Sequence, residues 1–332
     1  MQYLNTAPLV RGFTHGPLRG KYELSFTVPS QCAEALRSGA ADVAIIPAIE
    51  YQRIVSQGIG LTILPGLAIA SKERVRSLLV ISKVPIRQAH RIALDRSSRS
   101  TQALTKILCA RRWQIAPEFF EAAPPPFSIN DNAGNRDNAG SGHNGLAAML
   151  ANADAALIIG DAALRIAIAA ESHVVPGPDG EWLTTGATIG AASLSQLHIY
   201  DVVKEWWHLT EKPAVLAVWA AGTEVVTANP ELAADFLASR DFGLRHLPEI
   251  CAEAAQQMQL PEKELRLYLE KNIDYGLDED NLQGLLSFFH YSQALNLIGP
   301  LQPISMAAGP NSPARLLGLS GKRRVASGDR PG

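Results

Sequence analysis

Four hydroxyl groups and one guanidinium stand together in the run Ser97-Ser98-Arg99-Ser100-Thr101. The run follows a short apolar stretch at 91–94 and precedes a helical pattern, so we expect it at a strand-to-helix junction. Backbone N–H groups at a helix start are unpaired and carry partial positive charge, and the side chains add further donors. The junction therefore predicts a site for a carboxylate or phosphate. Simple helix capping is the alternative, although it needs one hydroxyl and not four.

A smaller version of this feature occurs earlier in the chain. Residues 22–28 are expected to form a strand, and Pro29-Ser30 then opens a helix that ends at Gly39. Ser30 is expected to be the N-cap of this helix. Taken alone, it is better explained by capping than by ligand binding.

Common catalytic and metal-binding motifs are absent from the sequence. It contains no HExxH, no phosphate-binding GxxxxGK[ST] loop, no GxGxxG after a strand and no GxSxG elbow. The eight histidines are scattered, so no metal site is predicted. The three cysteines, Cys32, Cys109 and Cys251, are far apart and are expected to be buried thiols in a reducing compartment.

Charge and hydropathy exclude several classes of partner. Lys and Arg number 30 against 32 Asp and Glu, so nothing favours binding to nucleic acid. No run of about 18 apolar residues predicts a membrane span. The first residues have neither the basic nor the apolar region of a signal peptide, so we expect a cytoplasmic protein.

Two stretches of the chain resemble each other. Residues 41–47 and 153–160 each consist of Ala-Asp, a short apolar strand, a Pro or Gly that ends it, and a following helix. They are consistent with two ordinary α/β crossovers, or with two equivalent lobes that each have a parallel sheet. In the second case a ligand would bind between the lobes, where helix N-termini converge. Further strands are expected at 61–64, 77–81 and 214–219, and Asp278 is expected to cap the last long helix.

Blocks of residues spread over about 1–300 resemble the chorismate dehydratases of the futalosine route to menaquinone. The matching blocks are Tyr3-Leu4-Asn5-Thr6-Ala7-Pro8-Leu9, Pro29-Ser30, Glu34-Ala35-Leu36, Gly39, Ala41-Asp42, Ile46-Pro47, Glu50-Tyr51, Val75-Arg76-Ser77-Leu78, Leu94-Asp95-Arg96-Ser97-Ser98-Arg99, Leu157-Ile158-Ile159-Gly160-Asp161-Ala162-Ala163-Leu164, Tyr200-Asp201, Glu205-Trp206, residues 213–220, and Asn272-Ile273-Asp274-Tyr275-Gly276-Leu277-Asp278. Each block alone is weak, but their order along the chain is specific.

The resemblance implies the two-lobed α/β fold of type II periplasmic binding proteins, with a ligand cleft between the lobes. It implies a hydro-lyase that needs no cofactor and no metal. The reaction would remove water from chorismate, a dianion, and give 3-[(1-carboxyvinyl)oxy]benzoate. It also implies Asn5 as a key active-site residue. Because an amide is not a base, our hypothesis is that Asn5 orients the substrate, whose own enolpyruvyl carboxylate takes the proton. The candidates for carboxylate contacts are Ser30, Ser77, Ser97, Ser98 and Thr101.

The implied fold also divides the chain. We expect residues 1–87 and 213–307 in the first lobe, 88–212 in the second, and a disordered tail at 308–332. Residues 128–145 and 173–197 are expected to be insertions in the second lobe. Relatives usually have a short strand before Tyr-Leu-Asn, so we expect the first sheet to lack a strand here.

Two alternative functions remain open. One is a non-catalytic cytoplasmic solute-binding protein with the same fold, because fold alone does not establish catalysis. The other is the dihydroxynaphthoate synthase of the same pathway, against which the Tyr-Leu-Asn and Ser-Ser-Arg blocks argue.

Overall fold

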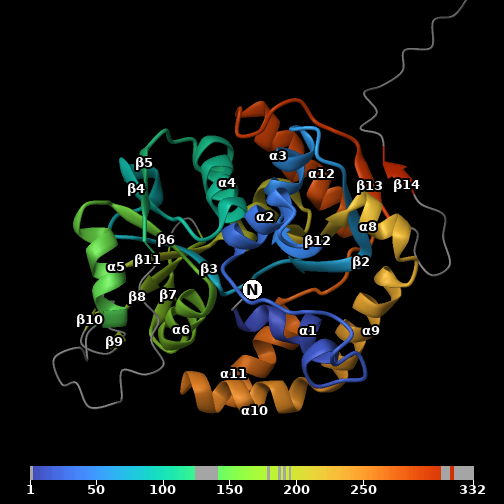
Figure 1. Ribbon diagram of the computed structural model, residues 1–332. Helices are drawn as coiled ribbons and strands as arrows, with labels where there is room; N and C mark the ends of the chain where they lie inside the picture. Colours follow the sequence, from blue (N-terminus) through green and yellow to red (C-terminus); the bar gives the residue numbers. More distant parts are fainter. Residues whose placement is uncertain are drawn as a thin grey trace, which may run out of the picture.

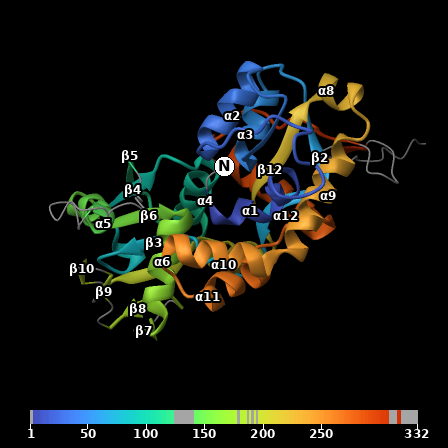
Figure 2. The same cartoon turned by 60° about the horizontal axis from the view of Figure 1, so that its bottom comes forward.

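Two mixed sheets with helices around them form the two lobes of the computed structural model (Figures 1 and 2). The structure describes residues 3–123, 141–177, 180–185, 188–189, 192–193, 196–307 and 315–317. The first sheet contains, in order, β1 (Val43–Pro47), β12 (Ala214–Gly222), β2 (Leu61–Ser71), β13 (Ile304–Met306) and β14 (Arg315–Leu317). The second contains β5 (Glu118–Ala122), β4 (Arg91–Asp95), β6 (Ala155–Ile159), β3 (Leu78–Ser82), β11 (His198–Asp201), β8 (Trp182–Thr184) and β7 (Val174–Pro176). The short strands β9 (Thr188–Ile189) and β10 (Ala192–Ser193) pair with each other.

The helices divide between the lobes in the same way. With the first sheet lie the turn η1 (Leu4–Thr6) and the helices α1 (Ala7–Thr14), α2 (Pro29–Ser38), α3 (Ala48–Val55), α8 (Thr223–Ala228), α9 (Leu232–Arg245), α10 (Leu247–Met258), α11 (Glu262–Leu267) and α12 (Glu279–Ala294). With the second lie α4 (Arg99–Leu108), α5 (Ser141–Ala151), α6 (Gly160–Glu171) and α7 (Val202–Thr210). This confirms the expected two-lobed α/β architecture. The expected cap of the last long helix is also confirmed, because the Asp278 carboxylate accepts a hydrogen bond from the backbone N–H of Asn281.

The expectation that each sheet is parallel is wrong. In the first sheet β12 runs antiparallel to both β1 and β2, and in the second β3 runs antiparallel to β6 and β11. Parallel pairs join β4 to β5 and β6, and β13 to β2. The apolar runs correctly indicated strands that are buried on both faces, but burial does not determine strand direction.

The strand expected at 22–28 is also wrong. Residues 23–28 have no regular secondary structure and belong to no sheet, and the side chains of Leu24 and Phe26 are exposed. Within the described residues, β1 pairs only with β12, so its other edge offers this segment no neighbouring strand. Tyr22 instead packs its ring edge-on against Phe13 and Phe236.

The chain crosses to the second sheet earlier than expected. Strand β3 was assigned to the first lobe, but it pairs with β6 and β11 of the second sheet. We therefore propose that the crossing lies at 72–77 and not near residue 88. The return near residue 213 falls between α7 and β12 and stays a prediction.

Three other expected segments lie partly outside the described residues. Of the segment 128–145, the structure describes only the backbone from Ser141 onward, as the start of α5. The expected insertion at 173–197 contributes β7 to β10. Of the tail expected to be disordered at 308–332, Arg315–Leu317 forms β14, which pairs with β13, and the rest is not described.

Close packing of α1 on α9 fixes the start of the described chain. A Cβ atom at Gly243 would lie 1.9 Å from the carbonyl oxygen of Pro8, and one at Gly12 would lie 2.4 Å from the Cα of Ser239. The hydroxyl of Ser239 also donates to the carbonyl of Leu9, at 2.8 Å. Glycine at the two contact points thus allows the backbones to approach closely, and this contact places η1 between the lobes.

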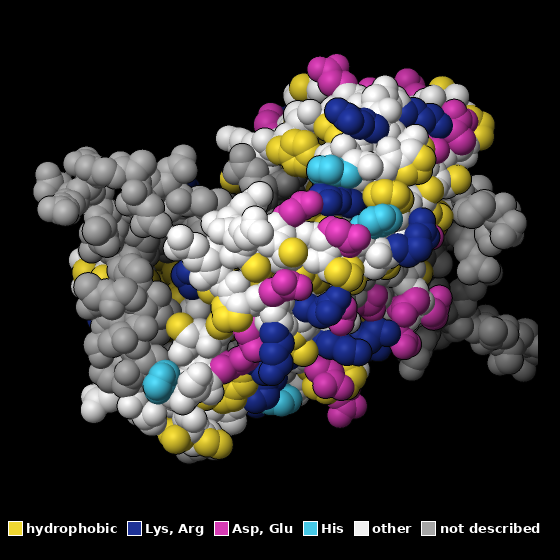
Figure 3. Space-filling model, turned by 90° about the horizontal axis from the view of Figure 1, so that it is seen from below, with side chains coloured by type: hydrophobic (Ala, Val, Ile, Leu, Met, Phe, Trp, Pro, Cys, Tyr) yellow, Lys and Arg dark blue, Asp and Glu magenta, His cyan; other side chains and the backbone are white. Residues whose placement is uncertain are grey.

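The surface carries charges of both signs. On the face seen from below, Lys and Arg side chains alternate with Asp and Glu side chains, without a large tract of one sign (Figure 3). In the part of the chain that the structure describes, no helix has the length and apolar character to span a membrane.

Asp201 and Arg76 hold the crossing segment in place. The Asp201 carboxylate accepts hydrogen bonds from the backbone N–H groups of Val75 and Arg76, at 3.1 and 2.7 Å. It also caps α7 by accepting from Val203 and Lys204, at 3.0 and 3.2 Å. The buried Arg76 guanidinium then pairs with Glu171 of α6 and Glu264 of α11, and so bridges the two lobes.

We predict that Asp201→Ala lowers the free energy of unfolding by about 3 kcal/mol, because four backbone donors lose their shared acceptor. Asp278→Ala is the matched control, since it also removes an N-cap aspartate but frees one donor, and it should cost about 1 kcal/mol. Urea unfolding measures both values. Equal losses in the two variants would contradict the anchoring role of Asp201.

Candidate functional site

A narrow pocket lies between the lobes and contains four of the six residues predicted from the sequence. Its lining is formed by Tyr3, Asn5, Pro29, Pro47, Ile69, Ser77, Leu78, Ser98, Thr101, Ile159, Gly160, Leu216 and Ala217. The predicted residues among these are Asn5, Ser77, Ser98 and Thr101. None of the lining residues has a side chain that is charged at neutral pH.

Four helices begin at this pocket. The first residue of α2 (Pro29), the N-cap of α3 (Pro47), the N-cap of α4 (Ser98) and the first residue of α6 (Gly160) all line it. None of the four N-cap residues caps its helix with a side-chain hydrogen bond. The partial positive charge of the four N-termini is therefore directed at one small space, which suits a ligand with carboxylate groups.

Asn5 presents an unpaired carbonyl oxygen. It lies in η1, and its buried Oδ1 atom has no hydrogen-bond partner. Tyr268 lies beside it: burial raises the pKa of the Tyr268 phenol, and its hydrogen bonds with the side chains of Ser77 and Asn5 partly offset this rise. Asn5 is thus placed with one polar atom still available to a ligand.

Three hydroxyl groups of the lining leave two protons available to a ligand. Tyr268 donates to Ser77 Oγ at 2.9 Å, so the proton of Ser77 itself remains available. Ser98 and Thr101 share one hydrogen bond of 3.0 Å between their hydroxyls, which leaves one of their two protons available. Ser77 follows the crossing segment and the other two begin α4, so both lobes supply donors.

Ser97 has a different role from the one expected. Its hydroxyl and its backbone N–H both donate to Asp95 Oδ1, at 2.6 and 2.8 Å. Because its single proton is used there, the Tyr3 hydroxyl must donate to Ser97 Oγ, at 3.0 Å. Burial raises the pKa of Tyr3 to about 12, so the phenol remains protonated at neutral pH. Ser97 therefore orients Tyr3 and does not itself line the pocket.

Ser30 does not cap its helix. The helix α2 begins at Pro29 with Val28 as its N-cap, so Ser30 is the second helical residue. Proline commonly occupies the first helical position because it has no N–H to satisfy, and this moves the cap back by two residues from the expected one. Ser30 is half-buried beside the pocket and is not part of its lining.

The first described residues contact the second lobe next to the pocket. The Leu4 N–H donates to Asp161 Oδ1 at 3.2 Å, and a Cβ atom at Gly160 would lie 2.6 Å from the Tyr3 ring. Burial raises the pKa of Asp161 to about 6, while the Leu4 N–H and the charge of Arg165 act in the opposite direction.

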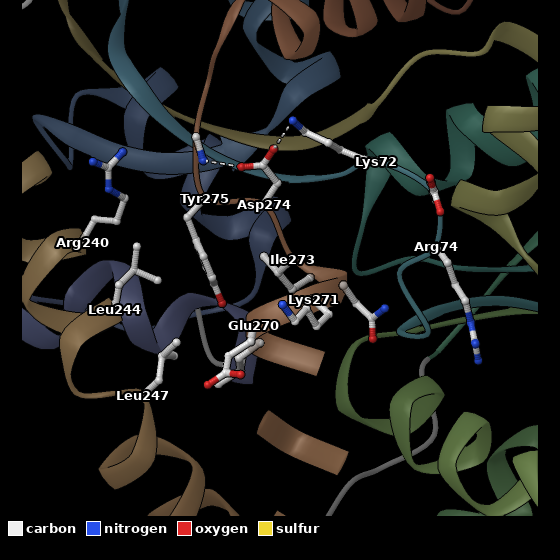
Figure 4. A pocket seen from close by; sticks show the side chains of 14 residues that line it. Lys72, Arg74, Arg240, Leu244, Leu247, Glu270, Lys271, Ile273, Asp274 and Tyr275 are labelled. Carbon is white, nitrogen blue, oxygen red and sulfur yellow. Dashed lines mark hydrogen bonds and ion pairs between the residues drawn. The ribbon is translucent and has the colours of Figure 1, made fainter. Parts of the chain in front are cut away.

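A larger groove lies elsewhere on the molecule, but its lining does not suit a ligand with carboxylate groups. It has a volume of about 680 Å³ and is lined by charged residues of both signs (Figure 4). Lys72 pairs there with Asp274 and Asp278, and Arg74 pairs with Glu171. None of the residues predicted from the sequence lines this groove, and opposite charges neutralise each other within it. We therefore place the candidate site in the pocket between the lobes.

The pocket is closed in this structure. Its free volume is about 40 Å³, which holds at most a few water molecules. A ligand of substrate size can enter only if the lobes separate. Among the described residues, no group of three or more His, Cys, Asp or Glu side chains could hold a metal ion.

Three residues at the site were missed as functional candidates from the sequence. Tyr3 and Asp161 lie in sequence blocks that resemble the family, but no local pattern indicated that these two segments contact each other across the lobes. An aspartate directly after a buried strand was a usable signal for Asp161. Tyr268 lies in a helical stretch with no sequence feature that points to the pocket.

Comparisons with known proteins identify the family of the chain. A family model described as menaquinone biosynthesis matches residues 1–294. The chorismate dehydratase of Thermus thermophilus is 28% identical over 307 residues, which cover 91% of this chain and 95% of that protein.

Solved structures resemble the fold. A protein of Archaeoglobus fulgidus aligns with a TM-score of 0.59 at 16% identity, over 89% of this chain and 96% of that one. The alkanesulfonate-binding protein SsuA of Xanthomonas axonopodis, bound to MOPS, gives 0.56 at 16% identity, over 90% and 92% of the two chains. The aliphatic sulphonate binding protein SsuA of Escherichia coli gives 0.53 at 15% identity, also over 90% and 92%. These likenesses confirm the type II periplasmic-binding-protein fold.

We predict that Gly160→Ala lowers the free energy of unfolding by about 3 kcal/mol. Gly160 has a φ of 67°, and an added methyl group would also collide with the Tyr3 ring. Gly39→Ala is the matched control, because Gly39 has a φ of 73° but no atom within 4 Å of an added Cβ. It should cost about 1 kcal/mol. Similar losses in urea unfolding would argue against a tight contact between Tyr3 and Gly160.

Proposed function

Because the chain belongs to the menaquinone biosynthesis family, we propose that it is a chorismate dehydratase. The reaction removes water from chorismate and gives 3-[(1-carboxyvinyl)oxy]benzoate. The relationship to the dehydratase of Thermus thermophilus supports this substrate. The observation that carries the proposal is the pocket itself: Asn5, whose carbonyl oxygen has no hydrogen-bond partner, lines a space bounded by four helix N-termini.

The electrostatics of the pocket fit a dianion. Chorismate carries a ring carboxylate and an enolpyruvyl carboxylate, both ionised at neutral pH. Helix N-termini stabilise such groups without any cationic side chain. The hydroxyl of Ser77 and one hydroxyl of the Ser98–Thr101 pair can donate to the same oxygens, and we propose that these hydroxyls bind the carboxylates.

The chemistry follows from the structure of the substrate. The C–H bond that breaks is on the ring carbon that bears the enolpyruvyl ether, and its electrons are conjugated with the ring carboxylate through a double bond. These electrons form the new ring double bond as the neighbouring C–OH bond breaks. The departing hydroxide takes up a proton and leaves as water. Formation of the aromatic ring makes the overall reaction favourable.

We propose that the enolpyruvyl carboxylate of the substrate takes the ring proton. The described lining contains no imidazole, carboxylate or amine that could act as a base. Asn5 would orient the substrate through its amide, so that the carboxylate lies next to the C–H bond. The base delivered with the substrate can return its proton to the departing hydroxide, so the protons balance.

Ser97 and Ser30 support the site less directly. Ser97 would act by holding the Tyr3 hydroxyl, and Ser30 would act from the first turn of α2. The lobes would separate to admit chorismate, because the free volume of the pocket is too small for it in this structure. They would then close around the bound substrate, less tightly than in this structure, and exclude water during the reaction.

The decisive test is incubation of the purified protein with chorismate, followed by mass spectrometry and ultraviolet absorbance. We expect an aromatic product lighter than chorismate by one water, formed only when the protein is present. Tight binding of chorismate without turnover would contradict the proposal and favour a solute-binding protein with the same fold.

We predict that Asn5→Ala lowers kcat by about 100-fold, because the substrate loses the group that orients it. Asn152→Ala, which changes an exposed asparagine of the second lobe, is the matched control and should retain full activity. Steady-state kinetics with chorismate measure both variants. Wild-type turnover by Asn5→Ala would exclude the proposed role of Asn5.

We predict that Ser98→Ala and Thr101→Ala each raise KM for chorismate about tenfold, because the two hydroxyls hold each other in place and together supply one free proton to a carboxylate. The double variant should lose less than the product of the two single effects, since the two hydroxyls share one hydrogen bond. Fully multiplicative effects on KM would show that the two hydroxyls act independently, against this model.

A further inference from the structure

One hydrogen bond links the turn that carries Asn5 to the opposite lobe. The backbone N–H of Leu4, directly before Asn5, donates to Oδ1 of Asp161 at 3.2 Å. Leu4 belongs to η1, which is continuous with α1 and packs with the first lobe. Asp161 lies in the first turn of α6 in the second lobe. The bond can therefore exist only while the lobes are together.

We propose that Asp161 is a positioning residue whose carboxyl group holds the Asn5 turn against α6 in the closed arrangement of the lobes. Asp161 does not line the pocket, so it acts through Leu4 and not on the substrate. The effect on turnover rests on the proposed function. The link between the lobes does not, because it can be measured without a substrate.

Other contacts between the two lobes lie next to the hydrogen bond between Leu4 and Asp161. The Tyr3 hydroxyl bonds Ser97 of the second lobe, and its ring covers Gly160, the residue before Asp161. Arg165, one turn further along α6, donates to the carbonyl of Met258 at the end of α10. Asp161 thus lies at the centre of a small interface between the lobes.

The ionisable groups that face Asp161 come from three elements. Arg165 on α6 lowers the pKa of its carboxyl group. The phenols of Tyr3, just before η1, and of Tyr268, after α11, have their own pKa values raised in part by the charge of Asp161. Both phenols are neutral between pH 5 and 8, so Asp161 is the group in this cluster that changes its charge in that range.

Protonation of Asp161 should favour closure. Burial raises its pKa to about 6 in the closed form, and the value should return toward its ordinary 3.8 when the lobes part and water reaches the carboxyl group. The closed form therefore takes up a proton as the pH falls through about 6. Above this pH the ionised carboxylate opposes closure. Repulsion between this carboxylate and a bound dianion opposes closure further.

Two variants separate the hydrogen bond from the charge. Asp161→Asn keeps an oxygen that can accept from Leu4 and resembles the protonated form. Asp161→Ala removes the acceptor. Asp154→Ala is the matched control, because the Asp154 carboxylate is likewise an acceptor for backbone N–H groups. Its donors, His90 and Arg91, lie in the same lobe as Asp154.

The first measurement is hydrogen exchange of the amides at 4–6, without substrate. We expect exchange to be at least tenfold faster in Asp161→Ala, and unchanged in Asp161→Asn and Asp154→Ala. Amides of β4 report global unfolding in each variant. Unchanged protection at 4–6 in Asp161→Ala would overturn the proposal, whatever the activity of the protein.

The second measurement is KM for chorismate between pH 5 and 8. In the wild type we expect KM to be about tenfold lower at pH 5 than at pH 8, because closure is coupled to the uptake of one proton. Asp161→Asn should have a KM close to the low-pH value of the wild type and independent of pH. A pH-dependent KM in Asp161→Asn would overturn the proposal. If the wild type does not turn over chorismate, the proposed function fails, and hydrogen exchange still decides the role of Asp161.

Discussion

The partial positive charge at helix N-termini is the interaction on which the pocket depends. The helices α2 and α3 belong to the first lobe, and α4 and α6 to the second, so each lobe provides half of the field. A ligand with two carboxylates experiences the full field only when the lobes are closed. The free energy of binding therefore includes the free energy of closing the lobes, so the hinge contributes to binding.

The coupling of binding to lobe closure explains why several polar side chains outside the pocket hold the lobes and the crossing segment in place. Asp201 anchors the crossing segment, and Arg76 bridges Glu171 and Glu264, one in each lobe. At the start of the described chain, the packing of α1 on α9 fixes one side of η1, and Asp161 fixes the other. The position of Asn5 is thus determined by both lobes at once, although its side-chain carbonyl oxygen accepts no hydrogen bond.

Sequence patterns predicted the parts of this arrangement that depend on local chemistry. The apolar runs placed β4, β6 and β12 correctly, and the hydroxyl cluster correctly marked the start of α4 at the pocket. Strand direction and the absence of a strand at 23–28 were not predictable, because both depend on which strand lies alongside. The roles of Ser97 and Asp161 depend on partners 94 and 157 residues away along the chain, and no local pattern encodes such contacts.

The absence of an acidic side chain from the described lining follows from the same field. A carboxylate placed there as a base would itself be attracted to the helix N-termini and would compete with the substrate for them. A neutral amide such as that of Asn5 can orient the substrate without this competition. If the base arrives as part of the substrate, the carboxylate that the pocket attracts is also the group that removes the proton. Strong binding of the dianion and catalysis then require the same arrangement of charge, and the protein needs only to position and enclose its ligand.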